Sequence, residues 1–597
     1  MRILLLTHAF NSLTQRLAAE LNERGHEISV EFDIADSVTE EAVAFFQPAL
    51  IIAPYLRRAI PESVWSRHVC LIVHPGIVGD RGPSALDWAI ANQETEWGVT
   101  VLQAQAEMDA GPVWASVTFP MRAARKSSLY RHEVTQAASA AVRLALQRFE
   151  SGGFVPQAQA DRAARGCARP LMKQADRSID WTRESSTSVL RKLQAADGFP
   201  GVADCLFGQP CHLFDAWPEA NLRGTPGAVI ARRETALLRA TIDGAIWIGH
   251  VKREGSIKLP ATLALEEESR TVPEAPLEGF WRVAIPTWQD IAYEEHGAVG
   301  TLHFEFYNGA MSTQQCERLR AALVWAKQRP TTVLLLLGGA DFWSNGIHLN
   351  VIEAASLSGG SAADESWCNI NAMNDLALEL INSEAQITIA ALGGNSGAGG
   401  CFLARACDQV WAREAVLLNP HYKNMGNLYG SEYWTYLLPR RVGVDAAQAI
   451  MHNREPLTAR RSLAIGLTDA CLGGDVPAFH AEVAQRAAAL ASAPDLSAQL
   501  AEKREARARD EALKPLATYR QEELAQMRRN FYGFDPSYHV ARHHFVNKSP
   551  ASWTPRHLAR HRDLNWDKKL SERTLPVTES APDSGLSSGF DFQGRKI

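Results

Sequence analysis

Two separate stretches of the sequence alternate short, uninterrupted apolar runs with amphipathic helical patterns. Near the N-terminus, an apolar run at 3–6 is followed by leucines at 13, 17 and 21, which recur at helical spacing until Gly25. The alternation continues through apolar runs at 26–31, 49–52 and 71–73. Uninterrupted apolar strands joined by helices are typical of a parallel sheet covered on both faces. We therefore predict an α/β domain at the N-terminus.

The second α/β pattern begins at 299, after a segment of different character. Residues 170–270 show short alternating strands and no long helical pattern after about 195, which favours a small β-barrel. A Pro- and Glu-rich stretch at 272–276 indicates a linker. The charged region at 496–530 is predicted to form one long helix. A chain of 597 residues is long enough for about three such domains.

Composition narrows the class of protein. With 46% hydrophobic and 21% charged residues, the chain has the composition of a folded globular protein. Its net charge of −6 gives no indication of a nucleic-acid partner. It has no window of 18 apolar residues and no signal-peptide pattern, so we expect neither membrane insertion nor secretion. Nine cysteines without a C-x-x-C pair disfavour a disulfide framework and favour the cytoplasm.

A histidine follows the buried strand predicted at 71–73. His74 begins the sequence His-Pro-Gly, and Asp109 lies further on in the sequence Asp-Ala-Gly-Pro. Ligands of parallel sheets bind beyond the carboxyl ends of the strands. A histidine and a carboxylate that meet there can relay a proton. The spacing alone does not distinguish this pair from structural residues.

The whole pattern, with Asp80-Arg81-Gly82-Pro83 and Gly98-Val99-Thr100, resembles the formyltransferases that use 10-formyltetrahydrofolate. The resemblance implies that His74 and Asp109 act on the tetrahedral adduct at the formyl carbon. It also implies that Ile72 occupies the position of a catalytic asparagine, so an oxyanion donor is lost. A better nucleophile than an amine, such as a thiol or water, suits such a site. A decayed formyltransferase that serves only as a scaffold is the alternative.

Two glycine-bounded turns mark a second constellation. One contains Ser344-Asn345-Gly346-Ile347, and the other contains Gly397-Ala398-Gly399-Gly400. Glycine lets backbone N–H groups approach a ligand oxygen closely, and two such amides form an oxyanion hole. A glycine run by itself is also compatible with a plain loop.

These turns, followed by Ala406-Cys407-Asp408, resemble the enoyl-CoA hydratase/isomerase (crotonase) family over about 299–550. The resemblance implies that the amides of Ile347 and Gly399 hold a thioester carbonyl and that Gly346 and Gly400 contact coenzyme A. The two glutamates of hydratases are replaced by Phe402 and His421, so ordinary hydration is disfavoured. The predicted acid and base for a different acyl-CoA reaction come from four residues, each of which has a structural hydrogen bond as its alternative role: His348, His421, Tyr422 and Glu432.

A basic C-terminal region completes the second constellation. Phe545-Val546-Asn547-Lys548 is similar to the helix that holds CoA phosphates in many crotonases, which implies phosphate contacts from Arg542 and Lys548. Histidines at 539/543 and 557/561 have a spacing that metal sites also use. No nearby Cys or Glu in the sequence completes a coordination set, so we predict no metal.

Together these patterns predict an α/β multidomain protein. Its expected parts are a formyltransferase-type Rossmann-like domain at 1–165, an OB-like β-barrel at 166–272, a linker at 273–298, a crotonase-type α/β domain with C-terminal helices at 299–570, and a disordered tail at 571–597. The barrel assignment rests on Lys173, Ile179-Asp180-Trp181 and Phe199-Pro200-Gly201, which are similar to methionyl-tRNA formyltransferases.

This domain order resembles the HypX/HoxX family of hydrogenase maturation factors. The resemblance implies a bifunctional enzyme that moves the formyl group of 10-formyltetrahydrofolate to coenzyme A and decomposes formyl-CoA to CO for [NiFe]-hydrogenase. It further implies hydrogenase maturation proteins or a hydrogenase large-subunit precursor as partners beside the small-molecule substrates. Two alternatives remain open: a formyl-folate hydrolase fused to an unrelated acyl-CoA enzyme, and a non-catalytic folate- or CoA-binding partner of hydrogenase precursors.

Overall fold

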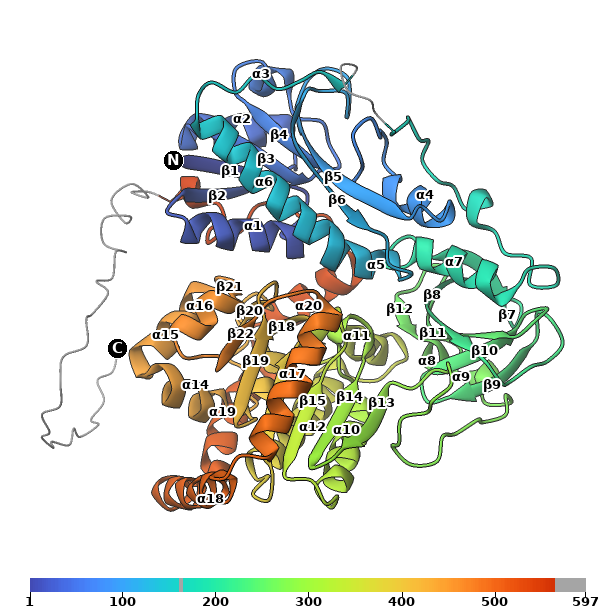
Figure 1. Cartoon of the computed structure of the whole chain (residues 1–597), viewed down its shortest axis with the longest axis vertical. Coiled ribbons are helices and arrows are strands. Elements are labelled where there is room, and N and C mark those ends of the chain that lie inside the picture. Colours follow the sequence, from blue (N-terminus) through green and yellow to red (C-terminus); the bar gives the residue numbers. More distant parts are fainter. Residues whose placement is uncertain (160–164, 564–597) are drawn as a thin grey trace, which may run out of the picture.

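The computed structural model describes residues 1–159 and 165–563, so the predicted tail lies outside the described residues. Figure 1 shows three parts: an N-terminal domain at the top, a C-terminal domain below it, and a middle domain at the right, beside the C-terminal domain. None of the helices in the described ranges is long and apolar enough to cross a membrane.

A six-stranded sheet in the order β2-β1-β3-β4-β5-β6 forms the centre of the N-terminal domain. The first four strands are parallel, and β5 and β6 are antiparallel to their neighbours. The apolar runs predicted from the sequence are the buried strands of this sheet. The elements are β1 (Arg2–Thr7), α1 (Ser12–Glu23), β2 (Glu27–Phe32), α2 (Asp36–Phe46), β3 (Leu50–Tyr55), α3 (Glu62–Trp65), β4 (Cys70–His74), α4 (Ala85–Ala91), β5 (Glu96–Gln103), β6 (Val113–Pro120), α5 (Lys126–Leu129), the π-helical turn η1 (Tyr130–Val134) and α6 (Thr135–Glu150).

Antiparallel strands make up the middle domain, in the order β7-β8-β11-β10-β9 with β12 paired to β11. Trp247, Leu237 and Val251 are fully buried between the sheet and its covering segments. The elements are η3 (Ala175–Arg177), α7 (Ser186–Ala196), β7 (Val202–Leu206), β8 (Gln209–Glu219), β9 (Val229–Arg233), β10 (Ala236–Ala240), β11 (Ala245–Arg253), β12 (Lys258–Pro260), α8 (Ala261–Ala264) and α9 (Glu266–Ser269).

Two sheets form the C-terminal domain, β13-β14-β15-β17-β19-β22 and the smaller β16-β18-β20-β21. The strands are β13 (Ile291–His296), β14 (Val299–Phe304), β15 (Val333–Leu337), β16 (Phe342–Ser344), β17 (Ile387–Leu392), β18 (Asn395–Gly397), β19 (Gln409–Arg413), β20 (Leu417–Asn419), β21 (Leu457–Thr458) and β22 (Ala470–Leu472). The helices are η4 (Tyr307–Gly309), α10 (Thr313–Ala326), α11 (Leu349–Leu357), α12 (Ala362–Ile381), α13 (Gly399–Arg405), α14 (Trp434–Val442), α15 (Val444–Asn453), α16 (Ala459–Ala464), α17 (Val476–Ala491), α18 (Leu496–Leu513), α19 (Leu516–Tyr532), α20 (Ser537–Asn547) and η5 (Arg560–Arg562).

Two boundaries differ from the sequence expectation. Strand β13 lies within the segment predicted as a linker, but it pairs with β14 and buries Ile291 and Tyr293, so the C-terminal domain begins there. The helix predicted over 496–530 is two helices, because Lys514 takes the extended conformation favoured before Pro515.

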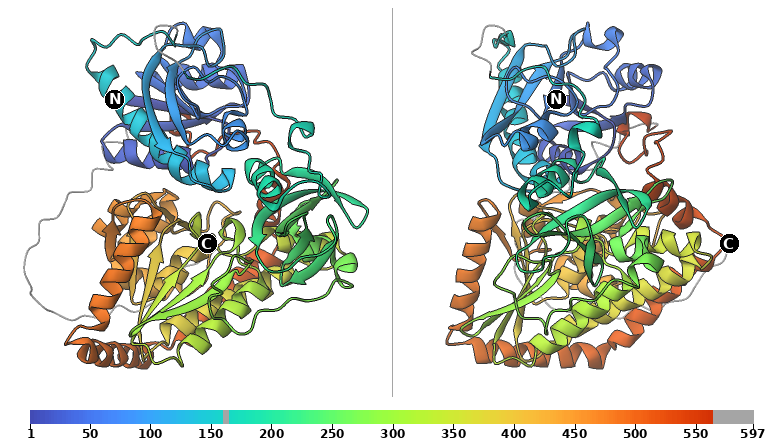
Figure 2. Two further views of the ribbon diagram at one scale, coloured as in Figure 1. Left: turned by 45° about the vertical axis from the view of Figure 1, so that its right-hand side comes forward. Right: turned by 90° about the vertical axis from the view of Figure 1, so that its right-hand side faces the viewer.

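Near the end of its described part, the chain returns to the N-terminal domain, as both views in Figure 2 show. Residues 548–563, which we call the C-terminal strap, pack on β2. The Val30 amide donates to the Leu558 carbonyl at 3.0 Å. Glu31, which is fully buried, accepts from Thr554 and lies 3.0 Å from His561 Nε2. The strap therefore ties the first domain to the last.

Candidate active sites

The first predicted pair does meet at the carboxyl end of β4. His74 Nδ1 lies 3.6 Å from Asp109 Oδ1, and the His74 side chain is buried. Asp109 has a positive φ of 54°, a conformation that costs energy in a residue other than glycine. Its loop is fixed by Gln159, whose side chain donates to the carbonyls of Asp109 and Gly111 at 2.8 and 3.0 Å. The geometry brings a carboxylate and an imidazole together beyond a strand end.

Ile72 lies two residues before His74 on β4, and the two side chains therefore point to the same face of the sheet. The Ile72 side chain packs against the apolar cluster that contains Cys70 and Ala104. It offers no hydrogen-bond donor to a reacting oxygen.

A second carboxylate beside His74 was not among the predicted site residues. Asp80 Oδ2 lies 3.1 Å from His74 Nε2, and Asp80 is 1% exposed. The sequence feature that could have indicated Asp80 is its position in the Gly- and Pro-rich loop that follows His74. Sequence spacing did not reveal the contact because residues 75–80 form an irregular turn that folds back over the histidine.

The two glycine turns of the C-terminal domain also meet. A methyl group added at Gly346 would lie 3.4 Å from the Gly399 nitrogen, and one added at Gly400 would lie 2.1 Å from the Ser344 carbonyl oxygen. Gly399 begins α13, and amides in the first turn of a helix have no partner within the helix. The predicted Ile347 and Gly399 amides thus come from adjacent turns.

Tyr422 and Glu432 form a buried pair next to these turns. The Tyr422 hydroxyl lies 2.5 Å from Glu432 Oε2, and its ring stacks on Phe402. A methyl group added at Gly399 would lie 2.3 Å from Glu432 Oε1, so the carboxyl group lies directly against the glycine. Burial raises the pKa of Glu432 to about 8, with a further contribution from the Glu523 charge. Burial also raises the pKa of Tyr422 well above its usual value.

The two histidines predicted as alternatives occupy different surroundings. His348 precedes α11, and its Nδ1 accepts from the Val351 amide at 3.3 Å, so it caps the helix. Burial lowers the pKa of His348 to about 3. Burial together with the charges of His557 and Arg454 lowers the pKa of His421 to about 4. Both rings are therefore uncharged at neutral pH.

Of the two predicted phosphate ligands, Arg542 is buried and already paired. On α20, Arg542 Nε donates to Glu353 Oε2 at 2.8 Å, and its Nη1 lies 2.7 Å from His539 Nδ1. Glu353 belongs to α11, the helix that follows the Ile347 turn. Lys548 is exposed, with its ammonium group 4.4 Å from the Phe545 ring centroid.

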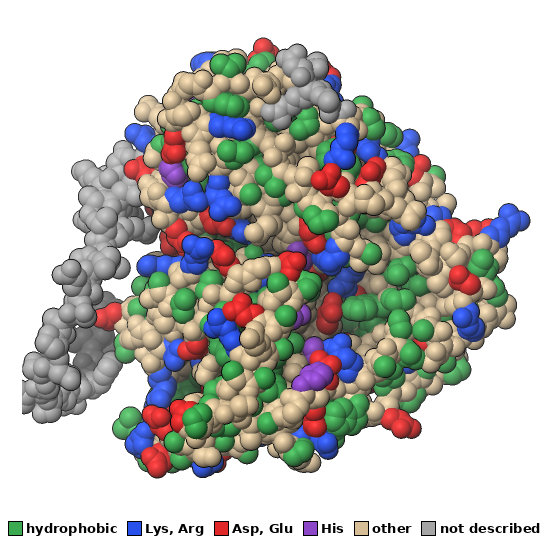
Figure 3. Space-filling model, viewed as in Figure 1, with side chains coloured by type: hydrophobic (Ala, Val, Ile, Leu, Met, Phe, Trp, Pro, Cys, Tyr) green, Lys and Arg blue, Asp and Glu red, His purple; other side chains and the backbone are tan. Residues whose placement is uncertain are grey.

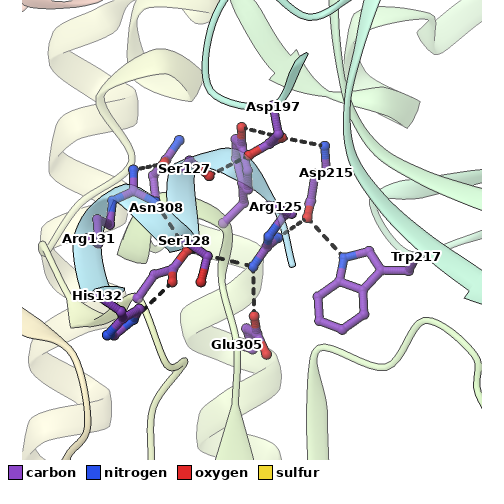
Figure 4. Close-up of polar contacts among 12 residues, drawn as sticks. Arg125, Ser127, Ser128, Arg131, His132, Asp197, Asp215, Trp217, Glu305 and Asn308 are labelled. Atoms are coloured by element: carbon purple, nitrogen blue, oxygen red, sulfur yellow. Dashed lines mark hydrogen bonds and ion pairs between the residues drawn. The ribbon is translucent and has the colours of Figure 1, made fainter. Parts of the chain in front are cut away.

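All three domains meet at a cluster of charged residues, shown in Figure 4. Arg125 precedes α5 and donates to Asp215 of the middle domain at 2.6 Å and to Glu305 of the C-terminal domain at 2.9 Å. Six residues further on, Arg131 donates to Asp341 at 3.1 Å. A groove of about 1130 Å³, lined by residues of all three domains, opens beside this cluster on the face shown in Figure 3.

Comparison with known proteins agrees with this arrangement. Residues 17–146 match the formyl transferase family, 171–267 match the formyl transferase C-terminal domain, and 298–556 match the enoyl-CoA hydratase/isomerase family. The hydrogenase maturation factor HoxX of Bradyrhizobium diazoefficiens is 54% identical over 94% of this chain and 97% of its own length. The chain belongs to the HypX/HoxX family of hydrogenase maturation factors.

Solved structures extend the comparison to the whole arrangement. HypX from Aquifex aeolicus in complex with tetrahydrofolic acid is 47% identical and has a TM-score of 0.91, covering 95% of this chain and 99% of that one. Methionyl-tRNA formyltransferase of Trichlorobacter lovleyi is 27% identical over 37% of this chain and 70% of its own length. The predicted HypX/HoxX membership and α/β multidomain fold class are confirmed, and the formyltransferase and crotonase-like domains support the prediction that the chain is an enzyme.

Proposed function

We propose that this HypX/HoxX protein makes the CO ligand of [NiFe]-hydrogenase. The formyl group moves from 10-formyltetrahydrofolate to the thiol of coenzyme A, and the resulting formyl-CoA decomposes to CO and CoA. The observation that carries the proposal is the buried Tyr422–Glu432 pair, which lies against the Gly399 turn where a crotonase holds its thioester.

His74 and Asp109 perform the first step in this proposal. Sulfur attacks the formyl carbon, the bond from that carbon to N10 of the folate breaks, and the thiol proton ends on N10. The imidazole carries that proton, because its Nδ1 faces the Asp109 carboxylate across 3.6 Å. Such contacts lengthen in the absence of substrate and tighten in the reacting complex. With Ile72 in place of a donor, the site favours a thiol over a weaker nucleophile.

The second step uses the C-terminal domain. The amides of Ile347 and Gly399 hold the thioester oxygen. The lack of a side chain at Gly346 and Gly400 lets the two turns that carry these amides lie close together. CO leaves as the carbon–sulfur bond breaks, the departing sulfur takes up a proton and the formyl proton is removed. Glu432, paired with Tyr422, donates its proton to the sulfur and then accepts the formyl proton, so it acts first as the acid and then as the base. Its carboxyl group is mostly protonated at neutral pH, because burial raises its pKa to about 8.

The surroundings fit coenzyme A in two respects. Amides in the first turn of α13 have no partner within the helix, as a site for a thioester oxygen requires, and α20 brings basic side chains to the same domain. Lys548 is free to contact a phosphate, whereas Arg542 has to share its charge with Glu353. We propose that the CO is delivered to hydrogenase maturation proteins or to a hydrogenase large-subunit precursor.

The test is anaerobic incubation of the full-length protein with 10-formyltetrahydrofolate and CoA, with reduced haemoglobin added to trap CO by its absorbance change. The wild-type protein should release CO, and His74→Ala should release none and consume no folate. Tyr422→Phe and Glu432→Gln should still consume folate while releasing at least tenfold less CO.

Two results would overturn the proposed function, and a third would keep it but change its catalytic residues. Formate without CO indicates a hydrolase fused to an unrelated acyl-CoA enzyme. Binding of both ligands without any turnover indicates a non-catalytic partner of hydrogenase precursors. Undiminished CO from both variants removes Tyr422 and Glu432 from the chemistry and moves it to His348 or His421.

A further inference from the structure

His74 lies between two carboxylates, and the proposed first step uses only one of them. Asp109 faces Nδ1 at 3.6 Å, whereas Asp80 lies within hydrogen-bond distance of Nε2, at 3.1 Å. Asp80 is more deeply buried than Asp109 and lies on the side of the ring away from it. Asp80 is therefore hydrogen-bonded to one ring nitrogen of His74, whereas Asp109 faces the other nitrogen at a longer distance.

The surroundings of Asp80 hold its carboxyl group in place. Arg169 Nε donates to Asp80 Oδ1 at 2.9 Å, which leaves Oδ2 for the histidine. The Arg169 guanidinium in turn lies 5.4 Å from the ring centroid of Trp97, whose Nε1 donates to the Pro75 carbonyl at 3.0 Å. Nε2 of His74 lies within hydrogen-bond distance of Asp80, whereas Nδ1 and Asp109 are 3.6 Å apart, so the geometry favours the ring proton on Nε2, where the Asp80 carboxylate accepts it.

The turn between the two residues is built for this contact. A methyl group added at Gly76 would lie 2.4 Å from His74 Nε2 and 2.7 Å from Asp80 Oδ2. A residue with a side chain at position 76 would therefore clash with the two groups that form the His74–Asp80 hydrogen bond. The Thr100 hydroxyl donates to the Gly76 carbonyl at 2.8 Å and fixes the turn on β5.

We propose that Asp80 is a positioning residue that holds His74 in the tautomer with the proton on Nε2. This inference rests on the proposed formyl transfer. The lone pair of Nδ1 then points toward Asp109 and the reacting groups. Nδ1 accepts the thiol proton and passes it to N10 of the folate. Asp80 keeps its hydrogen bond to Nε2–H throughout and neither gains nor loses a proton. The charged groups around the ring are Asp80, Asp109 and, behind Asp80, Arg169.

Asp80→Asn tests the role while preserving shape. In serine proteases, the corresponding Asp→Asn change lowers kcat by about 10⁴ because the wrong tautomer is held. We expect kcat for folate consumption to fall by at least about a hundredfold, with the Kd for tetrahydrofolate, measured by calorimetry, changed less than threefold. Gly76→Ala should give the same pattern, because the added methyl group separates the ring from Asp80.

The matched control is Asp87→Asn. Asp87 is a buried aspartate of the same domain whose partners are Lys126 and Arg177, at 2.9 and 3.2 Å. This change should lower the melting temperature without lowering kcat. Equal kcat values for the wild type and Asp80→Asn would overturn the role of Asp80 and leave the proposed function intact. A wild-type protein that consumes no formyl-folate would instead refute the proposed function.

A second measurement needs no variant of Asp80. In protein labelled with ¹⁵N-histidine, the His74 signals are assigned by their loss in His74→Ala. Their nitrogen shifts should show a protonated Nε2 and an unprotonated Nδ1. The opposite tautomer in the folded wild-type protein would exclude the proposal, even if Asp80→Asn failed to fold.

Discussion

Glu432 is a carboxyl group in a place where ionisation is costly. It is 1% exposed, its backbone has a positive φ of 58°, and its amide donates to Asn374 Oδ1 at 2.8 Å. The charge of Glu523, another buried carboxyl group, adds to the cost. A group held neutral at pH 7 by its surroundings can donate a proton to a departing thiolate.

The raised pKa of Glu432 has a consequence for stability. Between its ordinary value of 4.5 and about 8, the folded protein retains a proton that the unfolded chain has released. The free energy of unfolding should therefore fall as pH rises through this window, by up to about 1.4 kcal/mol per pH unit from this group. Urea unfolding of the wild type and of Glu432→Gln between pH 5 and 8 measures this change in the free energy of unfolding. The variant should lose less stability as the pH rises, and parallel curves would contradict the prediction.

Gly399 is predicted to tolerate no side chain. The methyl group of Gly399→Ala would lie 2.3 Å from Glu432 Oε1, which has no room to move in a buried site. Overpacking of this kind costs about 1–3 kcal/mol, and it displaces the proposed acid from the thioester position. We expect CO release to fall at least tenfold while folate consumption stays unchanged. Gly473→Ala is the control, since a methyl group there meets no atom within 4 Å.

At the scale of single residues, the sequence located His74, Asp109, Tyr422 and Glu432, and the structure brings each pair together. The sequence could not locate Asp80, because its contact depends on an irregular turn instead of a regular spacing. Nor could it show that Arg542 is paired, since its partner Glu353 lies 189 residues away in the chain. The roles of these side chains remain proposals.

At the scale of elements, the C-terminal strap has a direct effect on β2. The amides of Val30 and Phe32 donate to the strap at Leu558 and Thr554, at 3.0 and 2.9 Å. Between them, Glu31 lies 3.0 Å from His561 Nε2 and 2.8 Å from Arg562 Nη2. An edge strand without such a cover would expose unpaired backbone groups.

We predict that Glu31→Gln loosens the strap. Removing one partner of a buried ion pair costs about 3–5 kcal/mol, because the other charge is left unpaired. Amide hydrogen exchange at Val30 and Phe32 should accelerate strongly, as measured by mass spectrometry of the β2 peptide. Glu41→Gln, which removes only an exposed partner of Arg562, should leave exchange nearly unchanged. Equal protection in both variants would show that the strap is held by other contacts.

The elements that the sequence predicted best are those with a strong local pattern. Strands β1, β3 and β4 contain uninterrupted apolar runs, whereas β2 alternates apolar residues with Glu27, Ser29 and Glu31. Strands β5 and β6 were not predicted as antiparallel, because strand direction depends on pairing between distant segments. Strand β13 was placed in the linker because its polar residues Glu294 and Glu295 obscure a short buried pattern.

At the scale of the whole molecule, segment 125–132 of the N-terminal domain contacts both other domains. Arg125 joins Asp215 and Glu305, and its guanidinium lies 5.3 Å from the Trp217 ring and 5.7 Å from the Tyr307 ring. Arg131 and His132 hold Asp341, which directly precedes β16 and the turn of Ile347. The domain with the proposed folate site is thus attached to the strand that leads into the proposed thioester site.

Because one arginine joins three domains, Arg125→Met should uncouple the two proposed steps while leaving each site intact. The change leaves Asp215 and Glu305 without their shared cation, which weakens the junction by a few kcal/mol. An intermediate that is no longer confined between the domains is hydrolysed by water. We expect folate consumption to persist, with CO per folate consumed falling at least twofold and formate rising to match. Arg122→Met is the control, because Arg122 pairs with Glu133 and Ser128 inside its own domain. An unchanged CO yield in Arg125→Met would mean that the transfer between the sites does not depend on this junction.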